Sequence, residues 1–344
     1  MDMDNRPAEV AEALLKNLYA LKKDEVFVIT ADGGNDKTVI ETVAAAAKRL
    51  GAKVLAIYMP TPDGVGMAAD DGIAGDALVR ALAEADAWAE FNTKWIFGGR
   101  TYIRIMENNK KLRHMNLTGA SLRLINNCIA KVDYDSLRKF GLRFVEMIRD
   151  GKNFRMTSPT GMDLVFSNVA NRPILCELGE AYKPGTYMLP GQIAWTPDVA
   201  SVNGTIVFDG ALAPLCGIPS APVRVDIRDG QVQRFYGAPE AEQYYEWLKS
   251  YHDDQMMKIS HTGLGINPGA RLSGDILQDQ RVWGSATWAF GSIGANLLPP
   301  DGVPGASHSD CVALTISLWI DDEEIIREGQ IVHPELSALA EGLA

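Results

Sequence analysis

The sequence has few cysteines, and none of them has the spacing of a metal-binding or redox motif. The four cysteines are scattered along the 344 residues, at Cys128, Cys176, Cys216 and Cys311. This distribution predicts buried thiols rather than disulfides or a zinc site, and it favours a reducing compartment. The chain also lacks an apolar run of membrane-spanning length, and its N-terminus is acidic rather than signal-like. We therefore expect a cytoplasmic protein with no membrane partner.

Positive charge is scarce as well. The chain has 33 Lys and Arg against 44 Asp and Glu, which gives a formal net charge of −11. A protein that binds nucleic acid normally presents a basic face, so this balance argues against a nucleic-acid partner. The hydrophobic content of 47% is ordinary for a globular protein, and the length suffices for two domains with separate cores.

Helical and strand patterns alternate through the first part of the chain. We expect strands at 25–30 and 53–58 and helices over 8–22, 35–50, 76–85 and 134–149. Strands that alternate with helices across short loops predict a doubly wound parallel sheet, which we assign to residues 1–150. The loop at 31–36 contains neither G-x-G-x-x-G nor a P-loop, so we expect no nucleotide there, and Asn35 or Asp36 is expected to cap the next helix.

The pattern changes after Gly151 to short β-like runs separated by turn residues. We expect strands at 153–158, 163–167, 204–208, 223–228 and 231–236, and a helix over 244–251. The pair Asp229-Gly230 between the last two strands is a hairpin signal. Residues 151–344 are therefore predicted to form a β-rich α+β domain.

Two histidines and an aspartate in this second domain suggest a metal site. His308 and Asp310 precede an apolar, partly β-branched run at 312–318, which predicts a strand. At a spacing of two, a strand directs both side chains to one face. With His261 as a third ligand they would form a 2-His-1-carboxylate site, which leaves metal positions open in non-haem Fe(II) oxygenases. The alternative is a surface histidine and an aspartate in a turn.

The remaining histidines are weaker candidates. We expect His114 to be packed or exposed, His252 to be solvated at a helix end, and His333 to lie at the surface before Pro334.

A glycine-rich segment carries a family resemblance. The strings HTGLGINPGAR (261–271), FGSIGAN (290–296) and SHSD (307–310), with LPGQ (189–192) and SVNGT (201–205) upstream, resemble the leucyl-aminopeptidase-like superfamily. The resemblance covers most of the second domain. Its two chemical branches are dinuclear metallo-aminopeptidases and mononuclear iron 2,5-dihydroxypyridine 5,6-dioxygenases.

The ligand set favours the dioxygenase branch. A dinuclear peptidase needs additional carboxylates to bridge two ions. Here Gln192 stands where the peptidase branch has a Glu, and residues 281–285 contain no carboxylate. The resemblance therefore implies one Fe(2+) held by His261, His308 and Asp310. It also implies an oxidoreductase of the extradiol type, which cleaves a dihydroxylated pyridine and inserts both atoms of O2.

The chain departs from that branch around the substrate. The branch carries further pocket histidines, but the matching strings FNTKW (91–95) and LPGQ (189–192) contain none. The resemblance implies 2,5-dihydroxypyridine or a close analogue as the substrate, but the missing histidines favour a related hydroxylated heteroaromatic or aromatic ring. Gln192 is predicted to contact it. If a ring hydroxyl must lose its proton, we expect the bound metal ion to lower the pKa of that hydroxyl, or Glu177 or Lys94 to accept the proton.

Five further residues are predicted to contact the substrate: Trp95, Trp195, Arg281, Trp283 and Ser285. The tryptophans, with Trp288, would stack on a flat ring, and Arg281 and Ser285 would orient a polar substituent. Each has an ordinary structural alternative, since tryptophans are commonly core residues and arginines commonly form ion pairs.

Two other functions stay open from the sequence. One is a metal-dependent aminopeptidase of the same superfamily, and the other is a non-enzymatic small-molecule-binding protein. We also expect a homo-oligomer, and we expect the loop at 92–99, with Trp95, to reach the substrate from the same chain or from a neighbouring subunit.

Overall fold

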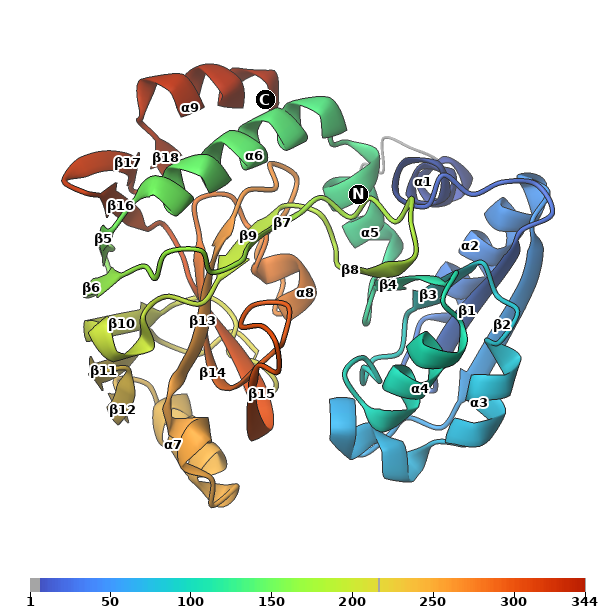
Figure 1. Cartoon of the computed structure of the whole chain (residues 1–344), viewed down its shortest axis with the longest axis horizontal. Helices are drawn as coiled ribbons and strands as arrows, with labels where there is room; N and C mark the ends of the chain where they lie inside the picture. Colours follow the sequence, from blue (N-terminus) through green and yellow to red (C-terminus); the bar gives the residue numbers. More distant parts are fainter. Residues whose placement is uncertain (1–6, 216, 344) are drawn as a thin grey trace. The chain divides into compact units, whose positions relative to one another are not determined.

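The computed structural model describes residues 7–215 and 217–343, and it divides into two compact units (Figure 1). The first unit extends to Lys131 and regains Leu178–Pro190, and the second comprises Val132–Glu177 and the chain from Gly191 onward. Cys216 and the acidic residues 1–6 lie outside the described residues. The other cysteines are free thiols, buried at Cys128 and Cys311.

The first unit is built on a five-stranded parallel sheet in the order β2-β1-β3-β4-β8. Its strands are β1 (Val26–Asp32), β2 (Lys53–Met59), β3 (Ala87–Glu90), β4 (Arg113–Asn116) and β8 (Gly185–Tyr187). Its α-helices are α1 (Pro7–Ala13), α2 (Lys37–Arg49), α3 (Gly75–Ala81), α4 (Arg100–Asn108) and α5 (Leu122–Ile125). The predicted parallel-sheet domain is confirmed, although the helix expected over 8–22 gives way to a π-helical turn at Leu14–Leu18.

Apolar side chains cover both faces of this sheet, because successive strand residues point to opposite sides. Val28 and Trp88 pack into one cluster with Leu78 of α3 and Ile105 of α4. The residue before Val28 in β1, Phe27, points the other way, and its ring lies 5.4 Å from that of Tyr19. At the end of β1, Asp36 caps α2 by accepting a hydrogen bond from the backbone N–H of Thr38, as expected.

Two carboxylates fix the loop that carries Trp95. Asp32, at the end of β1, accepts a hydrogen bond from the backbone N–H of Thr93 at 2.7 Å. Glu90, at the end of β3, accepts one from the backbone N–H of Ile96. The loop therefore belongs to the carboxyl edge of the parallel sheet, where ligand-binding loops of α/β folds lie.

The second unit contains two antiparallel sheets. The larger has the order β12-β11-β10-β6-β5-β16-β17-β18, and the smaller has the order β15-β14-β13-β9-β7. The strands of the larger are β5 (Asn153–Thr157), β6 (Asp163–Ser167), β10 (Asn203–Phe208), β11 (Val223–Arg228), β12 (Gln231–Tyr236), β16 (Ser317–Ile320), β17 (Glu323–Arg327) and β18 (Gln330–Ile331). Those of the smaller are β7 (Ile174–Glu177), β9 (Gln192–Trp195), β13 (Ile259–Gly265), β14 (Ala286–Ile293) and β15 (Val303–Ala313). The α-helices are α6 (Tyr134–Asp150), α7 (Pro239–Ser250), α8 (Ile276–Asp279) and α9 (Pro334–Ala340).

Aromatic side chains form the core between these two sheets. Trp195 of β9 packs on Phe154 with ring centroids 6.2 Å apart, and Trp288 of β14 packs edge-on against Phe166 at 5.2 Å. One face of the smaller antiparallel sheet, β15-β14-β13-β9-β7, is thus occupied by the core. Side chains of alternate residues along the same strands occupy the other face. None of the helices among the described residues is long and apolar enough to cross a membrane.

The division between the units differs from the expected boundary at residue 150. Helix α6 belongs to the second unit, where Phe140 packs on Trp283 with ring centroids 5.1 Å apart and Arg143 pairs with Glu335 of α9 at 2.7 Å. In the other direction, Leu178–Pro190 rejoins the first unit and adds β8 to its sheet. Amphipathic spacing identifies a helix, but it does not say which core the apolar face enters.

The predicted hairpin at Asp229-Gly230 is present between β11 and β12. Both residues have positive φ angles, 49° for Asp229 and 72° for Gly230, as a two-residue type I′ turn requires. A β-carbon on Gly230 would lie 2.2 Å from the backbone oxygen of Val199. This glycine is therefore required both by backbone conformation and by space.

We predict that Gly230→Ala destabilises the second unit more than Gly217→Ala does. Gly217 also has a positive φ, 59°, but a β-carbon there meets nothing within 4 Å. The stability of the control variant should fall only by the cost of a left-handed non-glycine residue, about 1–2 kcal/mol. Gly230→Ala adds to this cost a clash with the backbone of Val199. The midpoint of thermal unfolding, followed for both variants, measures the difference. Equal shifts would show that the turn relaxes around the new methyl group.

Candidate metal centre

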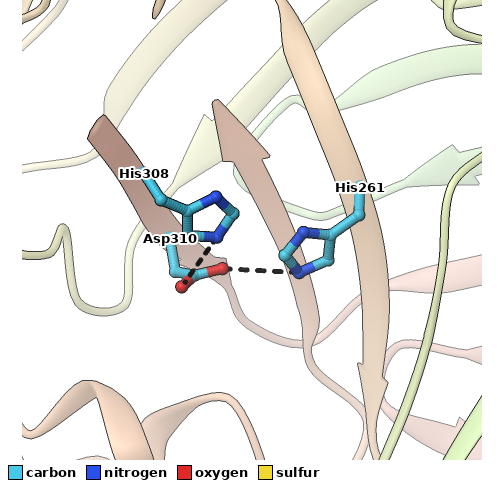
Figure 2. A group of neighbouring side chains, drawn as sticks. All are labelled: His261, His308 and Asp310. Atoms are coloured by element: carbon cyan, nitrogen blue, oxygen red, sulfur yellow. Dashed lines mark ion pairs between the residues drawn. The ribbon is translucent and has the colours of Figure 1, made fainter. Parts of the chain in front are cut away.

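Two strands, β13 and β15, bring His261, His308 and Asp310 together on the face of the smaller antiparallel sheet that lies opposite the aromatic core. Figure 2 shows His261 on β13 and the other two side chains on β15, all directed toward a common point. His261 Nε2 lies 3.5 Å from Asp310 Oδ1, and His308 Nε2 lies 3.4 Å from Asp310 Oδ2. One nitrogen or oxygen atom of each residue lies within 4.8 Å of the others.

Small residues on the intervening strand make this convergence possible. Strand β14 runs between β13 and β15, with Ala289 opposite Asp310 and Gly291 opposite His308. Residues paired directly across strands share one face of the sheet. Because Ala289 and Gly291 extend little above that face, the longer side chains on either side can meet over them.

Hydrogen bonding orients the His308 ring. Its Nδ1 donates to the backbone oxygen of Ser292 at 2.9 Å, so the lone pair of the neutral ring lies on Nε2, on the side of Asp310. A donor bond of this kind fixes the tautomer in metal-binding histidines. The His261 ring lies parallel to that of His308, with an angle of 3° and a centroid separation of 5.2 Å.

Burial and mutual charge set the protonation of the group. Burial lowers the pKa of His261 to about 4, although Asp310 opposes the shift. Burial alone would raise the pKa of Asp310, but His308 and His261 together hold it at about 2. The pKa of His308 is raised, because attraction to Asp310 outweighs burial. At neutral pH the group therefore offers a neutral His261 and an ionised Asp310, the forms that bind metals.

The unpaired atoms of this group fit a metal ion. His261 Nδ1 and Asp310 Oδ1 are buried and have no hydrogen-bond partner among the described residues, a costly state for polar atoms. Across residues 7–215 and 217–343, no other group of three His, Cys, Asp or Glu side chains comes close enough to hold an ion. Two imidazoles and one carboxylate form the donor set of non-haem iron sites with open positions.

Gln192 lies on the same face of the sheet. Gln192 is the first residue of β9 and pairs with Gly265 of β13. Counting by twos along β13, Gly265 is followed by Gly263 and then by His261. The Nε2 of Gln192 donates to the hydroxyl of Thr287 on β14 at 3.5 Å. Gln192 therefore lies on the face that carries the three candidate ligands, and its contact with a substrate stays a prediction. Sequence reasoning missed Thr287, whose place follows only from the register of β14.

Glu177 and Arg281 are each other's partners. Arg281 is only 1% exposed, and its Nη2 lies 2.6 Å from Glu177 Oε2. Burial raises the pKa of Glu177, with Asp310 raising it further and Arg281 opposing both. Arg281 also donates to Gln280. It is therefore not free to orient a substrate anion as expected, because its charge is already paired within the protein.

Three other residues predicted to contact the substrate make contacts within the protein. Trp195 is 1% exposed in the core between the sheets, and its Nε1 donates to Asn168 at 2.9 Å. It faces away from the site because it lies an odd number of positions from Gln192 along β9. Trp283 packs on α6, and the Ser285 hydroxyl donates to the backbone oxygen of Val282.

Trp95, Trp288 and the other three histidines do not belong to the group of three converging side chains. Trp95 lies half-buried in the first unit, and its contact with the substrate stays a prediction. His114 is buried, with its Nε2 hydrogen-bonded to Glu90 at 2.9 Å, and Trp288 lies in the core. His252 is exposed, whereas His333 lies 3.1 Å from Glu323 with little of its side chain exposed.

Comparison with known proteins identifies the family. A family model described as 2,5-dihydroxypyridine 5,6-dioxygenase matches residues 11–333. The 2,5-dihydroxypyridine 5,6-dioxygenase of Pseudomonas putida KT2440 is 24% identical over 322 residues, which cover 88% of this chain and 89% of that protein.

Solved structures show the same fold. A structure of 2,5-dihydroxypyridine dioxygenase from Pseudomonas putida KT2440 superposes with a TM-score of 0.76 at 19% identity, covering 98% of this chain and 100% of that one. Wild-type AmpT from Thermus thermophilus gives a TM-score of 0.69 at 14% identity, covering 95% and 99%. Since the family model spans nearly the whole sequence, this chain belongs to the 2,5-dihydroxypyridine 5,6-dioxygenase family.

Proposed function

We propose that this chain cleaves the ring of 2,5-dihydroxypyridine, or of a close analogue, with O2 and one Fe(2+) per chain. The observation that carries the proposal is the convergence of His261, His308 and Asp310 in a chain of this family. The partners are then a small heteroaromatic substrate and O2. The cytoplasmic location and the homo-oligomer expected from the sequence remain predictions.

His261, His308 and Asp310 would hold the iron, which supplies redox chemistry and acidifies a bound ring hydroxyl. The protein keeps the three donors converged before the ion arrives. The Ser292 carbonyl holds the His308 ring, and burial keeps His261 neutral. Because the sheet fixes all three residues, little rearrangement is needed on binding, which favours affinity.

The environment of the group argues against the aminopeptidase alternative. A second divalent ion needs further carboxylates. Glu177 is the acidic residue on this face beside Gln192, and it is committed to the buried Arg281. Gln192 contributes a neutral amide where the peptidase branch has a carboxylate. The likeness to AmpT therefore extends to the fold alone.

Glu177 is poorly placed to act as the general base that we considered from the sequence. If it took a proton, the charge of Arg281 would remain buried without its partner, which is costly. Gln192 fits the role of a substrate contact, since a carboxamide both donates and accepts.

We predict that Asp310→Ala removes iron while His252→Ala does not. Loss of one of three ligands should weaken binding by several kcal/mol, which is more than a hundredfold in Kd. His252 is an exposed histidine away from the group and serves as the matched control. Metal analysis of protein purified without air measures the outcome. Two tightly held zinc ions in the natural protein would refute the iron proposal and favour the peptidase.

We predict that metal affinity falls as the pH falls through the pKa of His308. That pKa is raised by Asp310, and protonation occupies the nitrogen that must bind the metal. Affinity should therefore drop about tenfold per pH unit below it, with one proton displaced per ion. His261, with a pKa of about 4, stays neutral above pH 5 and adds no second proton. Calorimetry of anaerobic Fe(2+) binding in two buffers counts the protons, and a count of two near pH 6 would contradict this assignment.

We predict that Gln192→Ala impairs turnover without loss of iron. One hydrogen bond to the substrate contributes about 1 kcal/mol, so kcat/KM for 2,5-dihydroxypyridine should fall several-fold to tenfold. Gln233→Ala, an exposed glutamine on β12, should change neither property. Oxygen consumption and iron content are measured together. Iron loss in Gln192→Ala would show that this residue supports the metal instead.

A further inference from the structure

Gly263 occupies the middle of a strand without any backbone reason to be glycine. It lies in β13, between β9 and β14, and its φ is outside the left-handed region. Glycine in a strand interior weakens the strand, and it often marks a close approach by another group. Here a β-carbon would lie 2.8 Å from Gln192 Nε2 and 3.1 Å from the Ile193 backbone oxygen.

The neighbouring glycine on the same face has a different reason. A β-carbon on Gly265 would lie 2.0 Å from the backbone oxygen of Val282, which cannot move aside. At Gly263, by contrast, the closest atom is the end of the Gln192 side chain. The missing side chain of Gly263 therefore opens a passage by which Gln192 crosses β13.

Thr287 receives the far end of this side chain. Gln192 Nε2 donates to Thr287 Oγ1 on the next strand, β14, at 3.5 Å. Thr287 lies two residues before Ala289, the residue paired with Asp310. Gln192 Oε1 accepts no hydrogen bond from any residue described. The anchored nitrogen thus leaves the oxygen as the open acceptor.

Along this face, side-chain exposure decreases from His308 and Asp310 to Gln192 and Thr287. The side chain of His308 is 32% exposed and that of Asp310 is 21% exposed, whereas Gln192 is 4% exposed and Thr287 is fully buried. A ring bound at the more open end, beside His308 and Asp310, would direct its opposite edge toward the closed end.

We propose that Gly263 and Thr287 are positioning residues for Gln192, and that they turn its Oε1 into the acceptor that recognises the ring N–H of a hydroxypyridone. This inference rests on the proposed function and specifies its substrate class. A 2-hydroxypyridine exists in water mainly as the pyridone, with an N–H beside a carbonyl. Hydroquinone has the same shape and hydroxyl positions but has C–H in place of N–H, so it cannot donate to Oε1.

The test is a double-mutant cycle of Gly263→Ala and Gln192→Ala, read as equilibrium binding to the anaerobic Fe(2+) protein. Calorimetry would measure the Kd of 2,5-dihydroxypyridine and of hydroquinone. Gly263→Ala should weaken 2,5-dihydroxypyridine about tenfold and change hydroquinone less than about threefold. In the Gln192→Ala background, Gly263→Ala should add less than about twofold, because its effect passes through Gln192.

Thr287 provides the conservative pair. Thr287→Val removes the hydroxyl at nearly constant volume and should reduce the preference for 2,5-dihydroxypyridine over hydroquinone, while Thr287→Ser should retain it. The inference is overturned if the Gly263 and Gln192 effects are additive, if both rings weaken equally, or if the natural protein does not distinguish the rings. Binding without oxygen-dependent cleavage of 2,5-dihydroxypyridine would instead refute the proposed function and leave the cycle readable.

Discussion

The two-residue period of the β-strand determines the arrangement of the second unit. Strands β9 and β14 of the smaller antiparallel sheet direct one set of alternate residues into the aromatic core and the other set to the face that carries the candidate metal centre. In β9, Trp195 faces the core and Gln192 lies on the opposite face. In β14, Trp288 faces the core and Ala289 lies on the opposite face. A shift of one residue in any strand would exchange the two faces, so the tight packing of the core also holds the polar group in register.

Local patterns were sufficient to predict much of the fold. The hairpin at Asp229-Gly230, the helix cap at Asp36 and the parallel sheet follow from turn chemistry, capping and periodicity, and the structure contains all three. The spacing of His308 and Asp310 predicted their common face, since that relation lies within one strand. His261 could be associated with them only as a candidate or through the family resemblance.

Contacts between segments distant in the sequence could not be predicted from local patterns. Arg281 was expected to face a substrate, but it pairs with Glu177, a residue more than one hundred positions away that no local pattern connects to it. Trp195 was expected to stack on a ring, yet counting from Gln192 along the strand would have placed it on the opposite face. The role of Gly263 depends on a neighbour from another strand, so it is invisible until pairing is known.

The path of the chain gives the site an unusual connection to the rest of the protein. Glu177 and Gln192 face each other on paired strands, yet the chain between them leaves the second unit and contributes β8 to the parallel sheet of the first. A hairpin turn would suffice to join two such neighbours. Instead, the two paired strands are joined through a strand of another sheet. The two units are therefore interleaved along the sequence and are not independent modules in series.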